Sequence, residues 1–347
     1  MRSSILILFI CIAFNKTGKA QVVVPSGEFR NIVSKDFLAN NYSSKFYNEL
    51  YTYQIQLDNG VQIVYTFSIN DFGSFKSRVT GAKLMVRWLN NKNYVVNKEY
   101  SVKQFINKAD SNILVLHPER SYWAKGSFED EHTVNFKTRK NGVEYDIKLT
   151  LYDIFPGVIW DDGVFKIKGN DFGIKMLIPH AKVKGYVSIN GEKVLASGSG
   201  MMDLTYQKNL PSKFLKKGYR IKSGDEKNGI VLNLYTVKHK GKLIPFGYGL
   251  KFRNGVQEYI TPNSIEFIDK KHTHGIKFDT EFNVELSDST NLEFKLVEKF
   301  NSYSILDELG GIRKTIAKWV LRGEAIEING IAEINNKPGY FTFLVIK

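Results

Sequence analysis

The sequence is poor in cysteine, in proline and in long apolar runs. Its 347 residues include a single cysteine, Cys11, and eight prolines. The one long apolar run, Ile5 to Phe14, is about half as long as a membrane-spanning helix, which excludes a multi-span helical membrane protein. Hydrophobic residues make up 43% and charged residues 24%, a globular composition. The length suits two domains or one large β domain.

The N-terminus predicts an export signal. Arg2 precedes the apolar run, and Gly18 and Ala20 place small residues at −3 and −1 before Gln21. We therefore expect residues 1–20 to be a signal peptide and the protein to be exported to the periplasm, the cell envelope or the medium, with an uncleaved anchor helix as the alternative. Cys11 lies in this segment, so the expected mature chain has no cysteine. Disulfides, thiol catalysis and cysteine-bound metals are then excluded.

The charge balance is basic, with 49 Lys and Arg against 35 Asp and Glu and a net charge of +14. Outside the cytoplasm, a basic surface meets anionic lipid or acidic polysaccharide rather than nucleic acid, so nucleic acid is not an expected partner. An anionic membrane surface is a second possible partner, after a hydrophobic small molecule or lipid. The basic residues are scattered, with no block longer than Lys216-Lys217 or Lys270-Lys271, which favours ordinary solvation of a β surface.

Alternation of apolar and polar residues dominates the chain. It is clearest over 143–151 and 278–286, where every second residue is apolar or a small Thr. Asn-Gly pairs, the strongest short-range signal for a hairpin turn, occur within such sequence; they lie at 59–60, 141–142, 190–191, 254–255 and 329–330. Helical periodicity is scarce, and a short helix over 305–319 is interrupted by Gly310-Gly311. The prediction is an all-β chain of antiparallel hairpins.

A sheet of this many strands needs closed or covered edges, because open edges lead to aggregation. The chain is also longer than a single barrel of about eight strands requires. We expect two lipocalin-like antiparallel β-barrels packed together. The joint is expected between Asp161 and Gly200, with an N-terminal domain over 21–195 and a C-terminal domain over 196–347. Aromatic residues make up 13%, and inward-facing aromatics either fill a barrel or line an apolar cavity in it, filling being commoner.

No motif for metal or phosphate binding is present, and no metal or organic cofactor is expected. His272 and His274 would share one face of a strand, but their charged neighbours favour a solvated turn. His180 follows Ile178-Pro179 and is expected near the middle of the molecule, with a structural role favoured over ligand binding. The acidic groups at 129–131 and 161–162 fit a charged surface and a turn better than a glycosidase pair.

The stretch from Gly198 to Gln207 is the most informative. A hairpin leads into Gly198-Ser-Gly200, and Asp203 follows in an apolar setting. A carboxyl group placed there can have a raised pKa and donate a proton. Equally, it can cap the bend by accepting hydrogen bonds from backbone amides, which is slightly favoured.

This stretch, an Asn-Gly hairpin followed by Gly-x-Gly-Met-Met-Asp203, resembles the carotenoid 1,2-hydratase (hydroxyneurosporene synthase) family and its wider lipocalin-like superfamily. The stretch over 49–60 resembles the opening aromatic strand of that family, 145–160 its strand into a proline-glycine turn, and 319–334 its closing hairpin. The resemblance implies two barrels with an apolar pocket near their junction. It also implies isoprenoid, lipid or polyketide-like ligands and no cofactor.

The resemblance further implies that the enzymes of the family use an Asp and a His at this bend to move a proton onto or off a hydrophobic substrate. Asp203 matches the aspartate, but Leu204 stands at the position of the histidine, and Met201 and Met202 replace the usual aromatic residue. The binding fold is therefore expected to persist, while hydration, cyclisation or isomerisation would depend on Asp203 as the acid.

Two functions follow as hypotheses, and a purely structural envelope protein without a ligand is a third possibility. The preferred one is an exported protein that binds, and can modify, a hydrophobic isoprenoid or lipid. Its expected polar contacts are Asp203, Tyr206, Gln207 and His180, and its apolar wall is Met202 and Trp160. The alternative is a secreted β-sandwich module that binds acidic glycans through surface charge and exposed aromatics.

Overall fold

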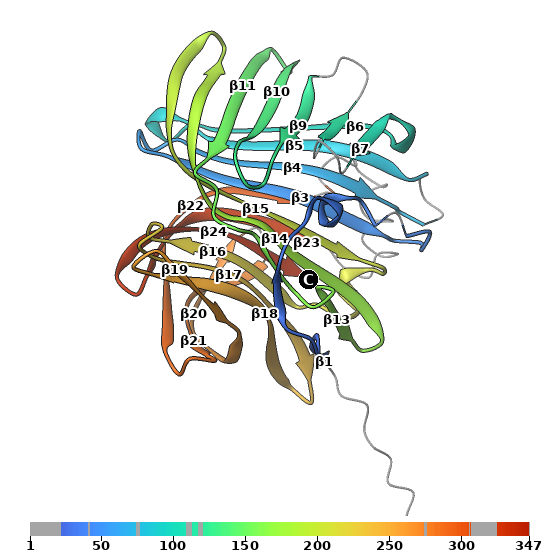
Figure 1. Ribbon diagram of the computed structural model, residues 1–347, viewed down its shortest axis with the longest axis vertical. Helices are drawn as coiled ribbons and strands as arrows, with labels where there is room; N and C mark the ends of the chain where they lie inside the picture. The colour runs from blue at the N-terminus through green and yellow to red at the C-terminus, as the bar shows by residue number, and fades with distance from the viewer. Residues whose placement is uncertain are drawn as a thin grey trace, which may run out of the picture.

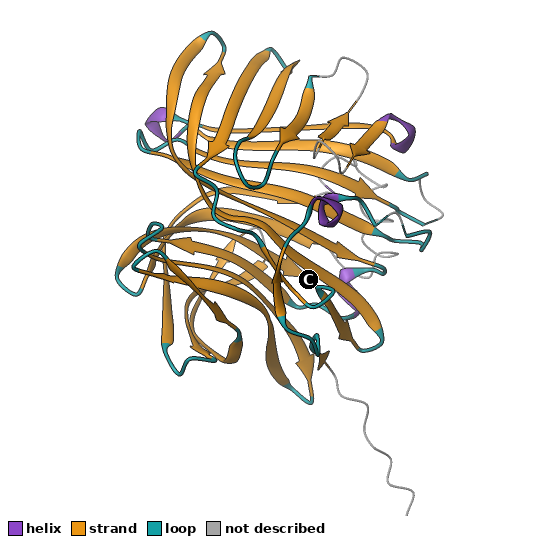
Figure 2. Ribbon diagram, in the orientation of Figure 1, coloured by secondary structure: helices purple, strands orange, loops and turns teal. Residues whose placement is uncertain are grey.

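The computed structural model describes residues 22–40, 42–73, 77–108, 113–116, 121–273, 276–304, 306 and 325–346. These ranges contain antiparallel strands and a few short 3-10 helices (Figures 1 and 2), so the predicted all-β class is confirmed. The expected signal peptide and nearly all of the predicted helix over 305–319 lie outside the described residues. Within them, no helix is long and apolar enough to cross a membrane.

The first sheet has the order β6-β5-β4-β3-β15-β14-β11-β10-β9-β8-β7, with β12 and β13 also pairing with β14 and extending it to β2 and β1. Its strands are β1 (Val22–Val23), β2 (Phe29–Asn31), β3 (Asn48–Leu57), β4 (Gln62–Asn70), β5 (Val79–Arg87), β6 (Asn93–Ser101), β7 (Phe105–Lys108), β8 (Ile113–Leu116), β9 (Tyr122–Gly126), β10 (His132–Lys140), β11 (Val143–Tyr152), β12 (Val158–Trp160), β13 (Val164–Ile167), β14 (Asn170–Ile189) and β15 (Glu192–Gln207).

The second sheet has the order β19-β18-β17-β16-β24-β23-β22-β21-β20. Its strands are β16 (Lys217–Ser223), β17 (Asn228–His239), β18 (Lys242–Arg253), β19 (Val256–Ile260), β20 (Pro262–Thr273), β21 (Ile276–Leu286), β22 (Asn291–Ser304), β23 (Ala325–Ile334) and β24 (Lys337–Ile346). The 3-10 helices are η1 (Ser34–Phe37), η2 (Leu89–Asn91), η3 (Val102–Gln104) and η4 (Pro211–Lys213).

Both sheets curl into barrels with separate apolar interiors. In the first, the edge strand β6 approaches β10 across the barrel, and Nζ of Lys140 on β10 donates to the carbonyl of Asn97 on β6 at 2.8 Å. In the second, β20 returns beside β18. Large aromatic side chains fill the first barrel, and Tyr51, Phe67 and Phe136 are among those with no exposed surface. Filling, the commoner outcome, therefore holds for these side chains.

The two barrels pack against each other through the outer faces of their central strands (Figure 1). The chain passes from one sheet to the other between β15, which ends at Gln207, and β16, which begins at Lys217. The expected boundary at 195/196 falls within β15. The central strand of the first barrel thus leads directly into the central strand of the second.

Four of the five Asn-Gly turns are found where they were predicted. The glycine of each has a positive φ, which glycine adopts at little cost. The fifth prediction is wrong, because Asn329 and Gly330 lie within β23, and the β23–β24 turn is made by Asn335-Asn336. Asn329 is buried at the junction, where it accepts a hydrogen bond from Thr342 at 2.6 Å. A Cβ at residue 330 would lie 2.7 Å from the Phe341 ring, so this glycine serves a close approach instead of a turn.

Candidate functional site

Strand β15 divides the predicted site residues between two environments. Successive side chains of a strand point to opposite faces. Met202, Leu204 and Tyr206 therefore point into the first barrel and belong to its core, whereas Met201 belongs to the apolar core of the junction. Asp203 is on the junction face with Met201, where it meets Arg220 of β16. The structure thus does not bring Asp203 together with Met202 or Tyr206.

Asp203 forms an ion pair across the junction. It has no exposed surface, and Nε of Arg220 donates to its Oδ2 at 2.6 Å, while Nη2 of Arg220 donates to Thr205 at 3.1 Å. Burial raises the pKa of Asp203, and the Arg220 guanidinium opposes that rise. A carboxylate held by arginine is a poorer proton donor than an isolated buried one, and this contact also connects the two barrels.

Further polar contacts line the same junction. Lys83 on β5 pairs with Glu327 on β23, and Gln54 on β3 donates to Thr342 on β24. Beside them lies an apolar cluster that includes Tyr248. Because each of these charges has an opposite partner, the contacts fix the register of the two barrels and leave little charge for a ligand.

The remaining predicted residues lie apart from one another. Trp160 stacks on Phe29 at 5.1 Å between ring centroids and donates from Nε1 to the carbonyl of Gly27 at 2.9 Å. His180 is buried between Phe155 and Phe252, with Nε2 3.4 Å from Oε2 of Glu226, and burial lowers its pKa to about 3. His180 does lie centrally, as expected.

A histidine that the sequence interpretation did not single out occupies the first barrel. His132 opens β10 and is fully buried, with its ring stacked between Tyr53 and Phe128. Its Nε2 shares a 2.8 Å hydrogen bond with the Tyr53 hydroxyl, and the backbone of Gly126 also interacts with the imidazole, although Nδ1 makes no hydrogen bond of ordinary geometry. Burial lowers the pKa of His132 to about 3 and raises that of Tyr53 well above its usual value. Both groups are therefore neutral near pH 7.

The N-terminal arm closes this end of the barrel. Strand β2 pairs with β12, and the amide of Ile32 donates to Gly157 at 3.0 Å. The carboxylate of Asp36 accepts from both terminal nitrogens of Arg30, at 2.8 and 2.9 Å. These contacts seat Phe37 inside the barrel, 5.2 Å from Phe128 and 6.1 Å from His132 between ring centroids.

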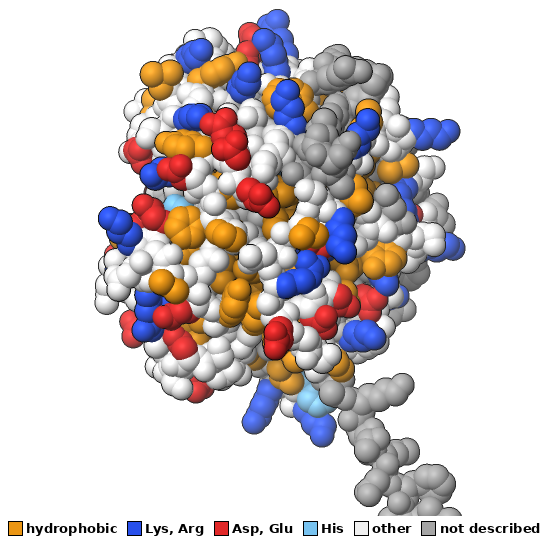
Figure 3. All heavy atoms as spheres, viewed as in Figure 1, with side chains coloured by type: hydrophobic (Ala, Val, Ile, Leu, Met, Phe, Trp, Pro, Cys, Tyr) orange, Lys and Arg blue, Asp and Glu red, His pale blue; other side chains and the backbone are white. Residues whose placement is uncertain are grey.

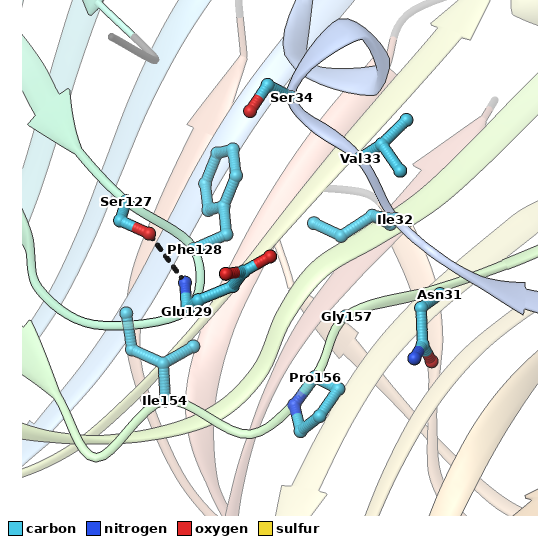
Figure 4. A pocket seen from close by; sticks show the side chains of 10 residues that line it. All are labelled: Asn31, Ile32, Val33, Ser34, Ser127, Phe128, Glu129, Ile154, Pro156 and Gly157. Atoms are coloured by element: carbon cyan, nitrogen blue, oxygen red, sulfur yellow. Dashed lines mark hydrogen bonds between the residues drawn. The ribbon is translucent and has the colours of Figure 1, made fainter.

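A cavity of about 390 Å³ lies between this arm and two loops (Figure 4). The volume is within the range of sites that hold small molecules. The arm contributes residues 31–34, the β9–β10 loop 127–129 and the β11–β12 loop Ile154, Pro156 and Gly157. Phe128 lines the cavity and also stacks on His132 at 5.1 Å, so its ring forms the wall between the two. The backbone carbonyl of Pro156 accepts a hydrogen bond from Nε2 of Gln257, which is on the second sheet. The cavity therefore lies near the junction of the two barrels.

The sequence held a signal for His132. On β10, His132, Val134 and Phe136 alternate with Thr133 and Asn135, and the alternate residues Val134 and Phe136 are plainly apolar. A histidine in phase with them is predicted to point inward. The acidic run 129–131 just before it obscured the start of the strand. No group of three potential metal ligands is found among the described residues; His274 lies outside them.

On the face drawn in Figure 3, basic and acidic side chains are intermingled, with apolar side chains between them. Tyr259 is the one aromatic side chain among the most exposed large hydrophobic residues of the described part, and Phe29 stacks on it at 4.4 Å. Surface aromatics of the kind that a flat glycan site uses are thus scarce in that part.

No protein-family model and no curated protein matches the sequence. Solved structures do match. An AttH candidate from Nitrosomonas europaea is 13% identical over 93% of this chain and 98% of its own, with a TM-score of 0.65. CghA bound to Sch210972 is 10% identical over 94% of this chain and 98% of its own, with a TM-score of 0.58. Kievitone hydratase from Nectria haematococca is 11% identical over 91% and 93%, with a TM-score of 0.54.

At these identities the likeness concerns the fold, and it extends over nearly the whole chain. The protein has the lipocalin-like two-barrel fold of these structures, which confirms the predicted fold class.

Proposed function

We propose that this is an exported protein that binds a hydrophobic isoprenoid or lipid in the cavity beside the first barrel, and that the Phe128 ring turns aside on binding so that His132, which lies behind it, recognises one oxygen atom of that ligand. The observation that carries the proposal is the neutral His132–Tyr53 pair, enclosed by aromatic rings and one side chain away from a cavity of about 390 Å³. The lining is mixed: side chains such as Ile32 and Ile154 offer apolar contacts to such a ligand, while polar ones such as Ser127 and Glu129 can fix its orientation.

The chemistry available to His132 follows from its neutrality. A neutral imidazole can donate its N–H to a carbonyl oxygen or accept a hydroxyl proton, and burial strengthens either contact. Polarising a carbonyl or holding a hydroxyl in this way is what hydration, cyclisation and isomerisation of a hydrophobic molecule require. The fold neighbours include a kievitone hydratase, which supports this class of reaction for the present chain.

The predicted role of Asp203 as a proton donor stays a prediction. Its ion pair with Arg220 and its place at the junction favour a structural role, and, like His132, it is not among the residues that line the cavity. Once a substrate is known, turnover by Asp203→Asn and His132→Gln distinguishes the two assignments. We expect the loss in His132→Gln to be the larger.

Binding is tested with Nile red as an apolar probe, in the wild type and in two tryptophan variants. Ile154→Trp adds bulk inside the cavity, whereas Leu195→Trp adds the same bulk at a site that is 80% exposed. We expect saturable binding of one dye per chain in the wild type and in Leu195→Trp. Binding should be at least ten times weaker in Ile154→Trp. Equal binding by all three proteins, or none by the wild type, would contradict the proposal.

A further inference from the structure

A second group of reactive side chains lies at the junction of the two barrels, at the opposite end from the contact between Arg220 and Thr205. Moving along the same face of β15, the residues are Thr205, Asp203, Met201 and then Ser199, which is partly exposed. Ser199 is flanked by Gly198 and Gly200, the glycine-rich stretch noted in the sequence. Two residues farther, Ser197 is exposed, so Ser199 is at the rim where the junction meets solvent.

Lys222 of β16 lies behind Ser199. Its side chain is 1% exposed, and Nζ donates to Oγ of Ser199 at 3.0 Å. No carboxylate in the described part forms an ion pair with it within 4.0 Å. Burial lowers the pKa of Lys222 to about 7, and Glu226 opposes that change. A large fraction of this amine is therefore neutral near pH 7, when the same contact allows Ser199 to donate to Nζ.

Tyr340 of β24 completes the group. It is 7% exposed, and its hydroxyl is buried without a hydrogen bond of ordinary geometry. Burial raises the pKa of this phenol, and its interaction with Ser199 opposes that rise. The other titratable groups that face Lys222 are His180 of β14 and Glu226, and Lys182 and Asp225 lie just beyond them. None of these residues lines the cavity beside the first barrel.

We propose that Ser199, Lys222 and Tyr340 form an acyl-transfer site, with Ser199 as the nucleophile, for esters of small carboxylic acids. A serine hydroxyl needs a neighbouring base to become nucleophilic, and a neutral lysine is one such base. The serine is partly exposed while the lysine behind it is buried, which is the order that a solvent-borne substrate requires. This site is independent of the proposed ligand cavity.

The reaction balances without a cofactor. Oγ of Ser199 attacks the ester carbonyl carbon as its proton passes to Nζ of Lys222, and the Tyr340 hydroxyl donates to the developing oxyanion. The bond to the alcohol then breaks, and Lys222 returns the proton to the departing oxygen. Water attacks the acyl-serine by the same route. The carboxylic acid leaves, and the free hydroxyl of Ser199 is restored.

An alkyl fluorophosphonate, which modifies activated serines, tests this proposal by peptide mapping of the full chain at pH 8. Ser197→Ala is the matched control, because Ser197 is on the same face of β15 but donates to Asp58 at 2.6 Å and has no lysine partner. We expect one label per chain, on Ser199, in the wild type and in Ser197→Ala. Labelling should be absent in Ser199→Ala and at least 100-fold slower in Lys222→Met.

Lys222→Arg provides a second variant, because it keeps a cation in place yet cannot act as a base near neutral pH. It should be as slow as Lys222→Met while keeping the wild-type unfolding midpoint within a few degrees. Hydrolysis of p-nitrophenyl butyrate should follow the same order among the variants. No labelling of the wild type, labelling at another residue, or equal labelling with and without Lys222 would overturn the proposal.

Discussion

Each of the two barrels buries a polar pair among aromatic rings, and these two pairs differ in charge. In the first, His132 and Tyr53 form a neutral pair. In the second, Asp279 has a fully buried side chain, and its Oδ2 accepts from the Tyr219 hydroxyl at 2.7 Å and pairs with Lys217. Burial lowers the pKa of Lys217, and Asp279 opposes that change.

This difference indicates which polar group is available to a ligand. The Asp279 pair satisfies its own charge inside the fold, as does the Asp203–Arg220 pair at the junction, and a compensated buried pair is costly to disturb. The His132–Tyr53 pair carries no charge to compensate and is separated from the cavity only by Phe128. We therefore propose structural roles for the charged pairs and a ligand-binding role for the neutral one.

The largest effect should come from breaking the charged pair of the second barrel. Asp279→Ala leaves Lys217 without its partner and Tyr219 without its acceptor. We expect a loss of about 3 kcal/mol in unfolding free energy, the low end for a buried pair because Lys217 is 15% exposed. Urea unfolding measures the loss. Nile red binding to the folded variant should be unchanged, and a variant of wild-type stability would contradict the assignment.

The pH dependence of stability sharpens the comparison. The pKa of His132 is about 3 in the folded protein against an ordinary 6.5. Between these values the unfolded chain binds a proton that the folded chain does not, so stability falls as the pH falls from 6.5 towards 3. Each such histidine contributes about 1.4 kcal/mol per pH unit in the middle of this window.

Urea unfolding at pH 6, 5 and 4 checks this expectation in the wild type and in His132→Gln. The variant should lose stability with falling pH less steeply, by about 1.4 kcal/mol per pH unit, whereas His180 and the carboxylates contribute equally to both proteins. Parallel curves would show that His132 is not a buried neutral histidine.

Removing one hydroxyl should have a smaller effect. Tyr53→Phe keeps the aromatic ring but removes the partner of Nε2 of His132, and we expect a loss of about 1 kcal/mol in unfolding free energy. Tyr65→Phe is a matched control within the same barrel, because its hydroxyl donates to the backbone carbonyl of Asn135 at 3.2 Å and does not contact His132. Only Tyr53→Phe should shift the ring ¹⁵N resonances of His132. Equal shifts in both variants would contradict the pairing.

The smallest effect is expected on the surface. Lys182 and Asp153 form an ion pair at 2.9 Å, and about half of each side chain is exposed. Lys182→Ala should change the unfolding free energy by no more than about 0.5 kcal/mol. A loss comparable to that of Asp279→Ala would remove the distinction between buried and exposed pairs on which the comparison depends.

Alternation was sufficient to predict the fold class, because one buried face of a strand leaves its period in the sequence. The same alternation separates Met202 and Tyr206 from Asp203, a consequence that the grouping of these residues by sequence proximity overlooked. The partner of Asp203 is on another sheet, and no local pattern identifies Arg220. Asn329-Gly330 misled for a related reason, since tertiary packing placed this turn-forming pair inside a strand.

The most direct test of the central claim is native mass spectrometry of the purified full chain, followed by organic extraction of what it carries. We expect one hydrophobic molecule bound per chain in the wild type and in Leu195→Trp, and its loss from Ile154→Trp. A wild-type protein that is empty and takes up no Nile red would contradict the claim that the cavity beside His132 is a ligand site.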